Sequence, residues 1–259
     1  MASEHAAYAL LSLGLVRIGP TRETPGTDER GVLHGRSRTW HDNGALSSAA
    51  WFSHGSPVGI ARRWSATGIL VREDRFADDG DRCGDQRSWH DNGQPRSLIG
   101  YDAGRLDGRC QVWLADGTLV RDGRFCAGRI DGEWRQFAPD GRLLGSFAMR
   151  HGNGEYRDWH DHGQIRREGR YRDGKMHGEW TQRSSTGELL GVLSFQDGSG
   201  TFRTWRENGV VAIEGVLLAG GRVGSWSYAT AGGEHEHIDF GKELAGDRVD
   251  PWLDPVAPP

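Results

Sequence analysis

The sequence predicts an all-β protein, an elongated array of about nine antiparallel β-hairpins that forms a meander or solenoid. Three observations predict this fold. One glycine recurs about every 24 residues, an aromatic residue follows it at a fixed distance, and turn-forming dipeptides separate short strand-like segments. With 40 glycines and only 36% hydrophobic residues, the chain lacks the material for a thick core. We therefore expect the 11 Trp, 8 Phe and 5 Tyr to supply most of the burial.

The repeat is defined by a reference glycine that occurs once in each unit. The reference glycines are Gly35, Gly59, Gly84, Gly108, Gly132, Gly154, Gly178, Gly200 and Gly224. Successive reference glycines lie 22 to 25 residues apart, and we attribute the steps of 22 to a second turn that has lost two residues. Positions within a unit are counted from this glycine below.

Two columns keep their distance from the reference glycine. Position 5 is aromatic in seven units, at Trp40, Trp64, Trp89, Trp113, Phe137, Trp159 and Trp205. Position 9 is glycine in every unit, and this column includes Gly44, Gly93, Gly117, Gly141, Gly163 and Gly209. We interpret the aromatic column as the structural core of the array and assign the glycines to turns. The alternative for the tryptophans is a row of stacking platforms for sugars, bases or methylated lysine.

Each unit is expected to run strand, tight turn, strand, tight turn. The dipeptide Asp116-Gly117 predicts a two-residue hairpin turn in which the glycine takes a positive φ. Aromatics at positions 2 and 5, such as Trp134 and Phe137, would fall on opposite faces of a regular strand. We therefore expect a bulge between them.

Three regions follow from this periodicity. Residues 1–30 are expected to form an N-terminal cap and linker, with a short helix over 3–14 that begins at Ser3 and ends before Gly14. Residues 31–241 hold the hairpin repeats, and 242–259 are expected to be a flexible C-terminal tail. Without a signal peptide or a membrane-length apolar run, the chain is expected to be cytoplasmic.

Charge and cysteine usage limit the classes of partner. The formal net charge is −4, and basic residues alternate with acidic ones, so no footprint for nucleic acid is expected. The same balance offers no polybasic stripe for membranes, which makes association with anionic lipid unfavourable. The three cysteines, Cys83, Cys110 and Cys126, have neither disulfide nor zinc spacing and are interpreted as free thiols.

Two groups of residues suggest chemistry. Trp-His-Asp occurs at 40–42, 89–91 and 159–161, where the histidine is either a base oriented by the aspartate or a turn residue copied by duplication. We favour the turn residue, because the copies lie in different units. His235 and His237, with Asp239, share one face of a strand and raise the question of a metal site. Same-face strand residues rarely converge on one ion, so we assign no metal, no cofactor and no catalytic residue.

The pattern Gly-Glu-Trp-Arg-Gln-Phe-Ala-Pro-Asp-Gly-Arg-Leu at 132–143, with Gly-Glu-Trp at 178–180, resembles the MORN-repeat variant of bacterial antitoxins of the YwqK type. The resemblance covers about residues 31–241. It implies a hairpin-repeat fold, no catalytic residue and membership of a toxin–antitoxin or immunity system. The wider MORN class also includes scaffolds that self-associate or lie near lipids.

The expected function is therefore that of a non-enzymatic protein-binding repeat protein. In the favoured hypothesis it is an antitoxin or immunity-type protein that occludes a partner protein, such as a toxin. The alternative is a peripheral scaffold that binds lipid headgroups or self-associates through its strand edges. Catalysis is disfavoured because no acid, base and nucleophile converge in the sequence.

Overall fold

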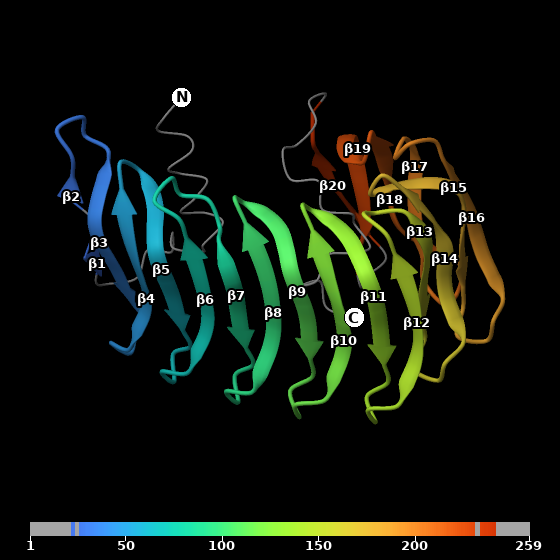
Figure 1. Cartoon of the computed structure of the whole chain (residues 1–259), viewed down its shortest axis with the longest axis horizontal. Coiled ribbons are helices and arrows are strands. Elements are labelled where there is room, and N and C mark those ends of the chain that lie inside the picture. Colours follow the sequence, from blue (N-terminus) through green and yellow to red (C-terminus); the bar gives the residue numbers. More distant parts are fainter. Residues whose placement is uncertain (1–21, 24–25, 231–233, 242–259) are drawn as a thin grey trace. The chain divides into compact units, whose positions relative to one another are not determined.

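The computed structural model describes residues 22–23, 26–230 and 234–241 of the chain. The expected helix over 3–14 and the tail over 242–259 lie outside these residues. Every regular element in the described part is a β-strand, and each strand pairs in antiparallel fashion with its neighbour (Figure 1). The predicted all-β array of hairpins is confirmed.

The chain divides into two compact units, Met1–Leu119 and Val120–Pro259. The first unit has its strands hydrogen-bonded in chain order from β3 onward, while β1 and β2 both pair with β3. Its strands are β1 (Arg22–Glu23), β2 (Gly26–Thr27), β3 (Leu33–Trp40), β4 (Leu46–Ser53), β5 (Ser56–Trp64), β6 (Leu70–Phe76), β7 (Gly84–Trp89), β8 (Pro95–Asp102) and β9 (Arg105–Trp113). The segment expected as a linker thus contributes two short strands to the sheet.

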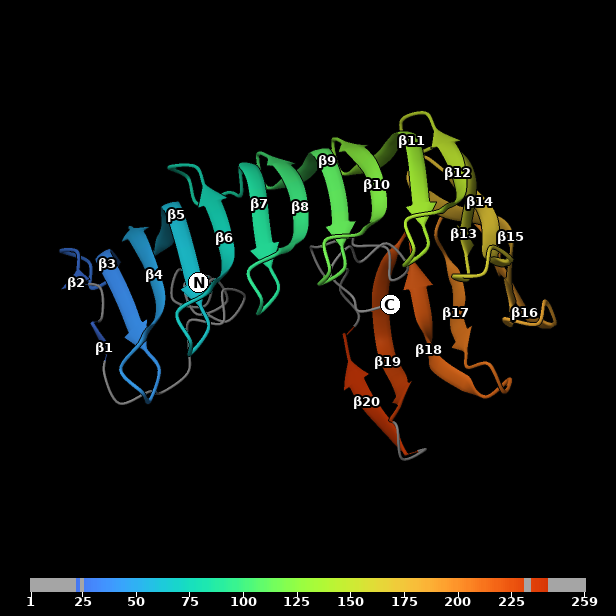
Figure 2. The ribbon, with the colours of Figure 1, turned by 90° about the horizontal axis from the view of Figure 1, so that it is seen from below.

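The second unit contains three groups of hydrogen-bonded strands, and the last of them is visible as a separate sheet in Figure 2. The first group is β10 (Leu119–Cys126), β11 (Arg129–Phe137) and β12 (Leu143–Met149). The second is β13 (Gly154–Trp159), β14 (Ile165–Arg172), β15 (Lys175–Arg183) and β16 (Leu189–Phe195). The third is β17 (Gly200–Trp205), β18 (Val211–Leu218), β19 (Gly221–Ala229) and β20 (His235–Asp239).

The first turn of a unit is a three-residue loop, so the expected two-residue turn at Asp116-Gly117 is wrong. The N–H of Leu114 donates to the carbonyl of Thr118 at 2.9 Å, and the N–H of Gly117 donates to the carbonyl of Leu114 at 2.9 Å. These bonds enclose a type I turn followed by Gly117 at a φ of +91°. Asp116 Oδ1 accepts the N–H of Thr118 at 2.8 Å. This side-chain bond stabilises the three-residue loop, in which an Asp-Gly dipeptide fits as well as in a two-residue turn.

The second turn of a repeat is a two-residue turn in seven repeats. The second turn over 77–81 is instead a three-residue loop, in which the N–H of Ala77 donates to the carbonyl of Asp81. At Ser53–Ser56 both central residues have positive φ, 47° at His54 and 86° at Gly55. The same conformation is adopted by non-glycine residues at Ala103, Ala127, His151, Asp173, Asp197 and Ala219. Type I′ turns match the right-handed twist of the strands, which favours them at this joint even without a leading glycine.

The position-9 glycine gives a direct test of the loop. Gly117→Val should lower the free energy of unfolding by about 1–2 kcal/mol, because a side chain at positive φ is strained whatever the surrounding space. Space is not limiting, since the nearest atom to an added Cβ is Gln94 Oε1 at 3.8 Å. Thr118→Val next in sequence should change stability by less than about 0.5 kcal/mol. Urea unfolding of the two variants measures the difference, and equal effects would contradict the loop geometry.

The deepest column of the structure lies at position 2. Its nine residues are all less than 9% exposed. They are Ser37, Ala61, Gln86, Cys110, Trp134, Tyr156, Trp180, Phe202 and Trp226. Position 17 forms the second buried column, at Phe52, Phe76, Phe125, Met149, Tyr171, Phe195 and Leu217. The two columns face each other across paired strands, as the pairing of Gly132 with Met149 and Trp134 with Phe147 indicates for one unit.

The position-5 aromatics lie nearer the rim than the core ladder that we expected. Among them only Trp159, 8% exposed, is buried, and the others are half-buried. The expected bulge is confirmed, because the register of β11 and β12 shifts between Gln136 and Phe137. This shift brings the position-5 side chain beside the first turn, where fewer neighbours cover it.

Several glycines serve packing rather than turns, which corrects their general assignment to turns. A Cβ built on Gly169 would lie 2.1 Å from the ring of Trp180, a distance that the two groups cannot share. The same close approach joins Gly123 to Trp134, Gly215 to Trp226, Gly145 to Trp159 and Gly191 to Trp205. Each of these glycines leaves the space in which an indole lies flat on the neighbouring strand.

Candidate functional site

The inner face is defined as the side of the sheet onto which the position-2 side chains project. In the second unit it carries a continuous row of aromatic rings. The row runs through Phe125, Trp134, Phe147, Tyr156, Tyr171 and Trp180, whose successive centroids lie 5.0 to 6.3 Å apart. Such spacing is typical of offset or edge-to-face aromatic contacts. The row therefore forms a preformed apolar wall.

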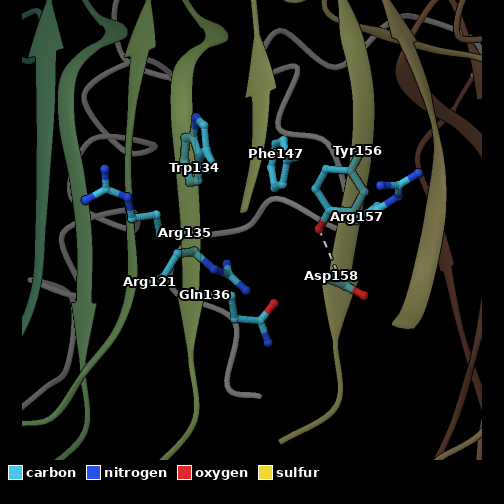
Figure 3. Close-up of a pocket in the computed structure, with 8 residues that line it drawn as sticks. All are labelled: Arg121, Trp134, Arg135, Gln136, Phe147, Tyr156, Arg157 and Asp158. Carbon is cyan, nitrogen blue, oxygen red and sulfur yellow. Dashed lines mark hydrogen bonds between the residues drawn. The ribbon is translucent and has the colours of Figure 1, made fainter. Parts of the chain in front are cut away.

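A shallow, solvent-open depression lies on this wall. Its lining residues come from β10 to β13 and are Arg121, Trp134, Arg135, Gln136, Phe147, Tyr156, Arg157 and Asp158. Figure 3 shows the rings of Trp134, Phe147 and Tyr156 in a row, with Arg121, Gln136 and Asp158 along one side of them. The depression thus joins an aromatic strip to a polar strip.

The depression lies beside an interruption of the hydrogen-bonded sheet. The ladder breaks between β12 and β13 and again between β16 and β17, which are the two places where the repeat is 22 residues long. At each break the shortened turn leaves one isolated bridge, Arg150 with Asn153 and Gln196 with Ser199. The missing residues remove the rungs that would otherwise join the two strands.

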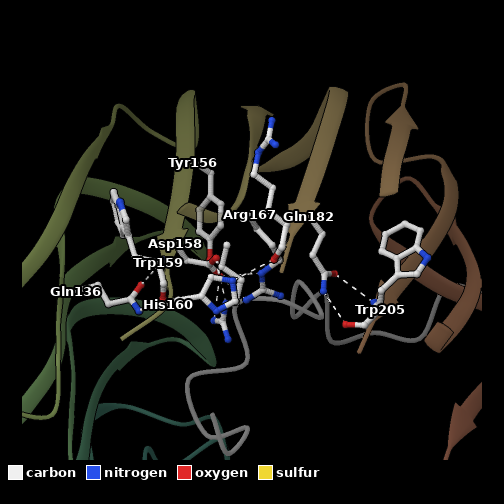
Figure 4. A network of polar contacts seen from close by, with 10 residues as sticks. Gln136, Tyr156, Asp158, Trp159, His160, Arg167, Gln182 and Trp205 are labelled. Carbon is white, nitrogen blue, oxygen red and sulfur yellow. Dashed lines mark hydrogen bonds and ion pairs between the residues drawn. The ribbon is translucent and has the colours of Figure 1, made fainter. Parts of the chain in front are cut away.

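A glutamine at position 4 spans each break. Gln136 Nε2 donates to the carbonyl of Trp159 at 2.7 Å, and the N–H of Trp159 donates back to Gln136 Oε1 at 3.2 Å. Gln182 makes the same pair of bonds to Trp205, at 2.7 and 3.3 Å (Figure 4). The amide side chain has the donor and acceptor arrangement of a peptide group, so it replaces a missing rung.

This bridge is tested by removing its amide. Gln182→Leu should lower the free energy of unfolding by about 2 kcal/mol, because the N–H and carbonyl of Trp205 lose their partner. Amide hydrogen exchange at Trp205 should accelerate in parallel. Gln196→Leu, at an exposed site of the adjoining turn, is the control and should leave exchange at Trp205 unchanged. Identical amide exchange at Trp205 in both variants would show that the Gln182 bridge does not stabilise this part of the sheet.

Asp158 holds the centre of the polar strip. It is 2% exposed and accepts bonds from Arg166 Nε at 3.3 Å, from Arg167 Nε at 2.8 Å and from the hydroxyl of Tyr156 at 3.3 Å. Burial alone would raise the pKa of this carboxyl, but the charges of Arg167 and Arg166 outweigh burial and lower the pKa. The same ion pair raises the pKa of Arg167 against the effect of burial. Figure 4 shows this group next to the Gln136 bridge.

The histidines of the Trp-His-Asp motifs bind the following repeat. The Nε2 atoms of His41, His90 and His160 lie 2.8, 2.9 and 3.0 Å from the carbonyl oxygens of Trp64, Trp113 and Arg183. A carbonyl oxygen only accepts, so each Nε2 carries the proton and donates it. This geometry supports the turn interpretation and adds coupling between repeats, and it does not form a base oriented by an aspartate.

The other suggested chemistry lies on β20. His235 and His237 are exposed, and His235 Nδ1 lies 2.7 Å from Ser227 Oγ. The described residues contain no group of three or more His, Cys, Asp or Glu side chains placed to hold a metal ion. They also contain no helix with the length and apolarity of a membrane span.

No sequence motif marks Arg121, Tyr156 or Asp158. Arg121 is at position 13 of one repeat, and Tyr156 and Asp158 are at positions 2 and 4 of a later repeat, where the residue type varies along the chain. Only the folded array brings Arg121 to the same depression as the other two. The nearest available signal was the step of 22 residues, since it marks where a strand ladder ends.

Comparison with known protein families gives a match for two hairpins of the array. Residues 82–103 and 153–173 match the family model of the MORN repeat variant. These segments contain the hairpins β7–β8 and β13–β14, which other units of the array repeat. No curated protein matches the sequence significantly, so no named relative supports the resemblance to YwqK-type antitoxins.

Proposed function

We propose that this array of MORN-variant repeats is a non-enzymatic protein-binding module, an antitoxin or immunity-type protein that occludes a partner protein with its inner face. The observation that carries the proposal is the open depression in the second unit, which combines three aromatic rings with three arginines. Tryptophan, tyrosine and arginine dominate the energetic centres of protein interfaces. The antitoxin role rests in addition on the resemblance of residues 132–143 to the YwqK type.

The rigidity of the wall supports a binding role. Trp134 and Tyr156 are each 3% exposed, and the rings beside them fix their orientation. Side chains that are already ordered lose little conformational entropy when a partner docks. A cytoplasmic location belongs to the same proposal and is supported by Cys83, Cys110 and Cys126, none of which forms a disulfide in the described part of the chain.

The second candidate function is a scaffold that self-associates or binds lipid headgroups. The specific observation in its favour is a group of half-exposed aliphatic side chains on β16 and β18, at Val192, Val216 and Leu218. All residues of β20 are exposed, so its backbone is accessible for pairing with another chain. Sedimentation equilibrium and co-sedimentation with phosphatidylserine vesicles distinguish this function from occlusion of a different protein.

The antitoxin proposal is tested in the native host. The tagged full chain is expected to co-purify with one stoichiometric protein, and expression of that protein alone is expected to arrest growth. Co-expression of the chain should restore growth. The antitoxin role would be contradicted if the tagged chain co-purified with no other protein. It would also be contradicted if expression of the co-purified protein left growth unchanged.

A further inference from the structure

We infer that the partner surface covered by the inner face is acidic, and that a carboxylate beside an apolar side chain of the partner binds in the depression at Arg121. This inference rests on the proposed function, because it names the chemistry of the partner that the same face would occlude.

The depression and its polar strip hold more positive than negative charge. Two lining arginines, Arg135 and Arg157, pair with Glu133 and Glu168. The remaining charged groups are Arg121, Arg166, Arg167 and Asp158, three positive and one negative. Arg166 and Arg167 both bind Asp158, so the single carboxylate is already fully engaged. The strip retains an excess of positive charge, although the whole chain has a net charge of −4.

Arg121 has no counter-charge directly opposite it on the neighbouring strand. It pairs across the strands with Gln136, whose side-chain amide is hydrogen-bonded to the backbone of Trp159. No ion pair or side-chain hydrogen bond joins Arg121 to another residue in the part of the chain that the structure describes. A half-buried guanidinium next to aromatic rings is weakly screened by water, which strengthens its attraction to an incoming carboxylate.

An apolar surface lies beside Arg121. The rings of Trp134, Phe147 and Tyr156 form the apolar part of the depression (Figure 3). A planar guanidinium binds a carboxylate through two parallel N–H···O bonds, which fixes the orientation of the acid. An aromatic or aliphatic side chain next to that acid would then lie over Phe147, which is half-buried, whereas Trp134 and Tyr156 are almost fully buried.

The first unit also has an inner-face arginine with an unsatisfied N–H group. Arg63 occupies position 4 on the inner face, where its Nε atom is buried and has no hydrogen-bond partner. It pairs across the strands with Arg72, whose guanidinium already binds Asp74 at 2.6 Å. Burial and the charge of Arg72 lower the pKa of Arg63. The buried Nε–H of Arg63 lacks an acceptor, although the charge of Asp74 on the neighbouring strand acts on the guanidinium. A carboxylate from another molecule would supply that acceptor.

The outer face differs in this respect. Its arginines are paired within the sheet, for example Arg203 with Glu214 and Arg170 with Glu155. Such exposed pairs leave little net charge for a partner to recognise. The excess of positive charge therefore distinguishes the inner face from the outer one.

The test uses the full chain and a displayed library of random dodecapeptides, selected at physiological salt. Selected peptides should be enriched in Asp or Glu next to an aromatic or aliphatic residue. Their affinity, measured by fluorescence anisotropy with synthetic peptides, should fall at least tenfold for Arg121→Glu and by less for Arg121→Gln. Arg170→Glu, an exposed outer-face reversal, is the matched control and should change the affinity less than twofold.

Thermal unfolding followed by circular dichroism confirms that all three variants are folded. Absence of acidic enrichment, failure to select any peptide, or equal losses for the Arg121 and Arg170 reversals would overturn the inference. Stronger binding of phosphatidylserine vesicles or of single-stranded DNA, lost in Arg121→Glu, would assign the arginine to phosphate and also overturn it. If a native protein partner binds wild type and Arg121→Glu equally, the proposed function stands and this inference alone fails.

Discussion

Trp180→Ala is expected to lower the free energy of unfolding by about 3–5 kcal/mol, as large-to-small changes at buried aromatics do. The side chain is 1% exposed. Its ring lies 5.0 Å from Tyr171 and 5.5 Å from Tyr156, and it covers the backbone of Gly169. Truncation therefore leaves a cavity between two strands and two rings. Gly169, on the neighbouring strand, has no side chain that could move into this cavity.

The matched control is Trp113→Ala at position 5. Trp113 is half-buried, so about half of the core effect, roughly 1–2 kcal/mol, is expected. Urea unfolding measured by intrinsic fluorescence and by circular dichroism gives both values. In a nearest-neighbour array the core variant should also broaden the transition, because it uncouples flanking repeats. Equal losses at the two positions would contradict the assignment of position 2 as the core column.

The period of the repeat was predictable because turns require particular residues. Glycine at position 9 recurs in every unit, and each of these glycines that the structure describes has a positive φ. The spacing alone thus gave the hairpin array. It could not give the turn type, because Asp-Gly suits both a two-residue turn and a three-residue loop.

The core column was less predictable because the buried position 2 holds different residue types in the two compact units of the chain. In the first unit the column holds small or polar residues such as Ser37 and Ala61. In the second unit it holds rings such as Trp134 and Trp180. A pattern search based on residue type therefore favours position 5, where tryptophan recurs but burial is incomplete. The bulge that separates the two positions became visible only as an odd spacing.

The candidate site depends on contacts between residues that lie far apart in sequence. Each His and Gln that ties one repeat to the next binds a carbonyl 23 residues away, for example His90 with Trp113 and Gln136 with Trp159. Such bonds follow from strand pairing and have no local signature. The same holds for Arg121, which becomes significant because its neighbours are already occupied.

The buried ion pair at Asp158 carries the second large prediction. Asp158→Ala is expected to lower the free energy of unfolding by about 3–5 kcal/mol, because it leaves the guanidinium of Arg167 buried without its counter-charge. The side chain of Arg167 is only 13% exposed. Glu214→Ala is the control, because the ion pair of Glu214 with Arg203 is exposed to solvent. Its removal should lower the free energy of unfolding by less than about 1 kcal/mol.

The sign of the pH dependence follows from the same contacts. The folded-state pKa of Asp158 is lowered below the unfolded value of about 3.9, so its stabilisation is complete above that pH. It is lost as the pH falls below about 4 and through the folded-state pKa. The free energy of unfolding of the wild type should therefore fall more steeply over this acid range than that of Asp158→Asn, which has no proton to bind. Urea titrations at several acidic pH values measure both slopes. Parallel curves would mean that Asp158 has the same pKa in the folded and unfolded states, and that Arg166 and Arg167 do not stabilise its charged form.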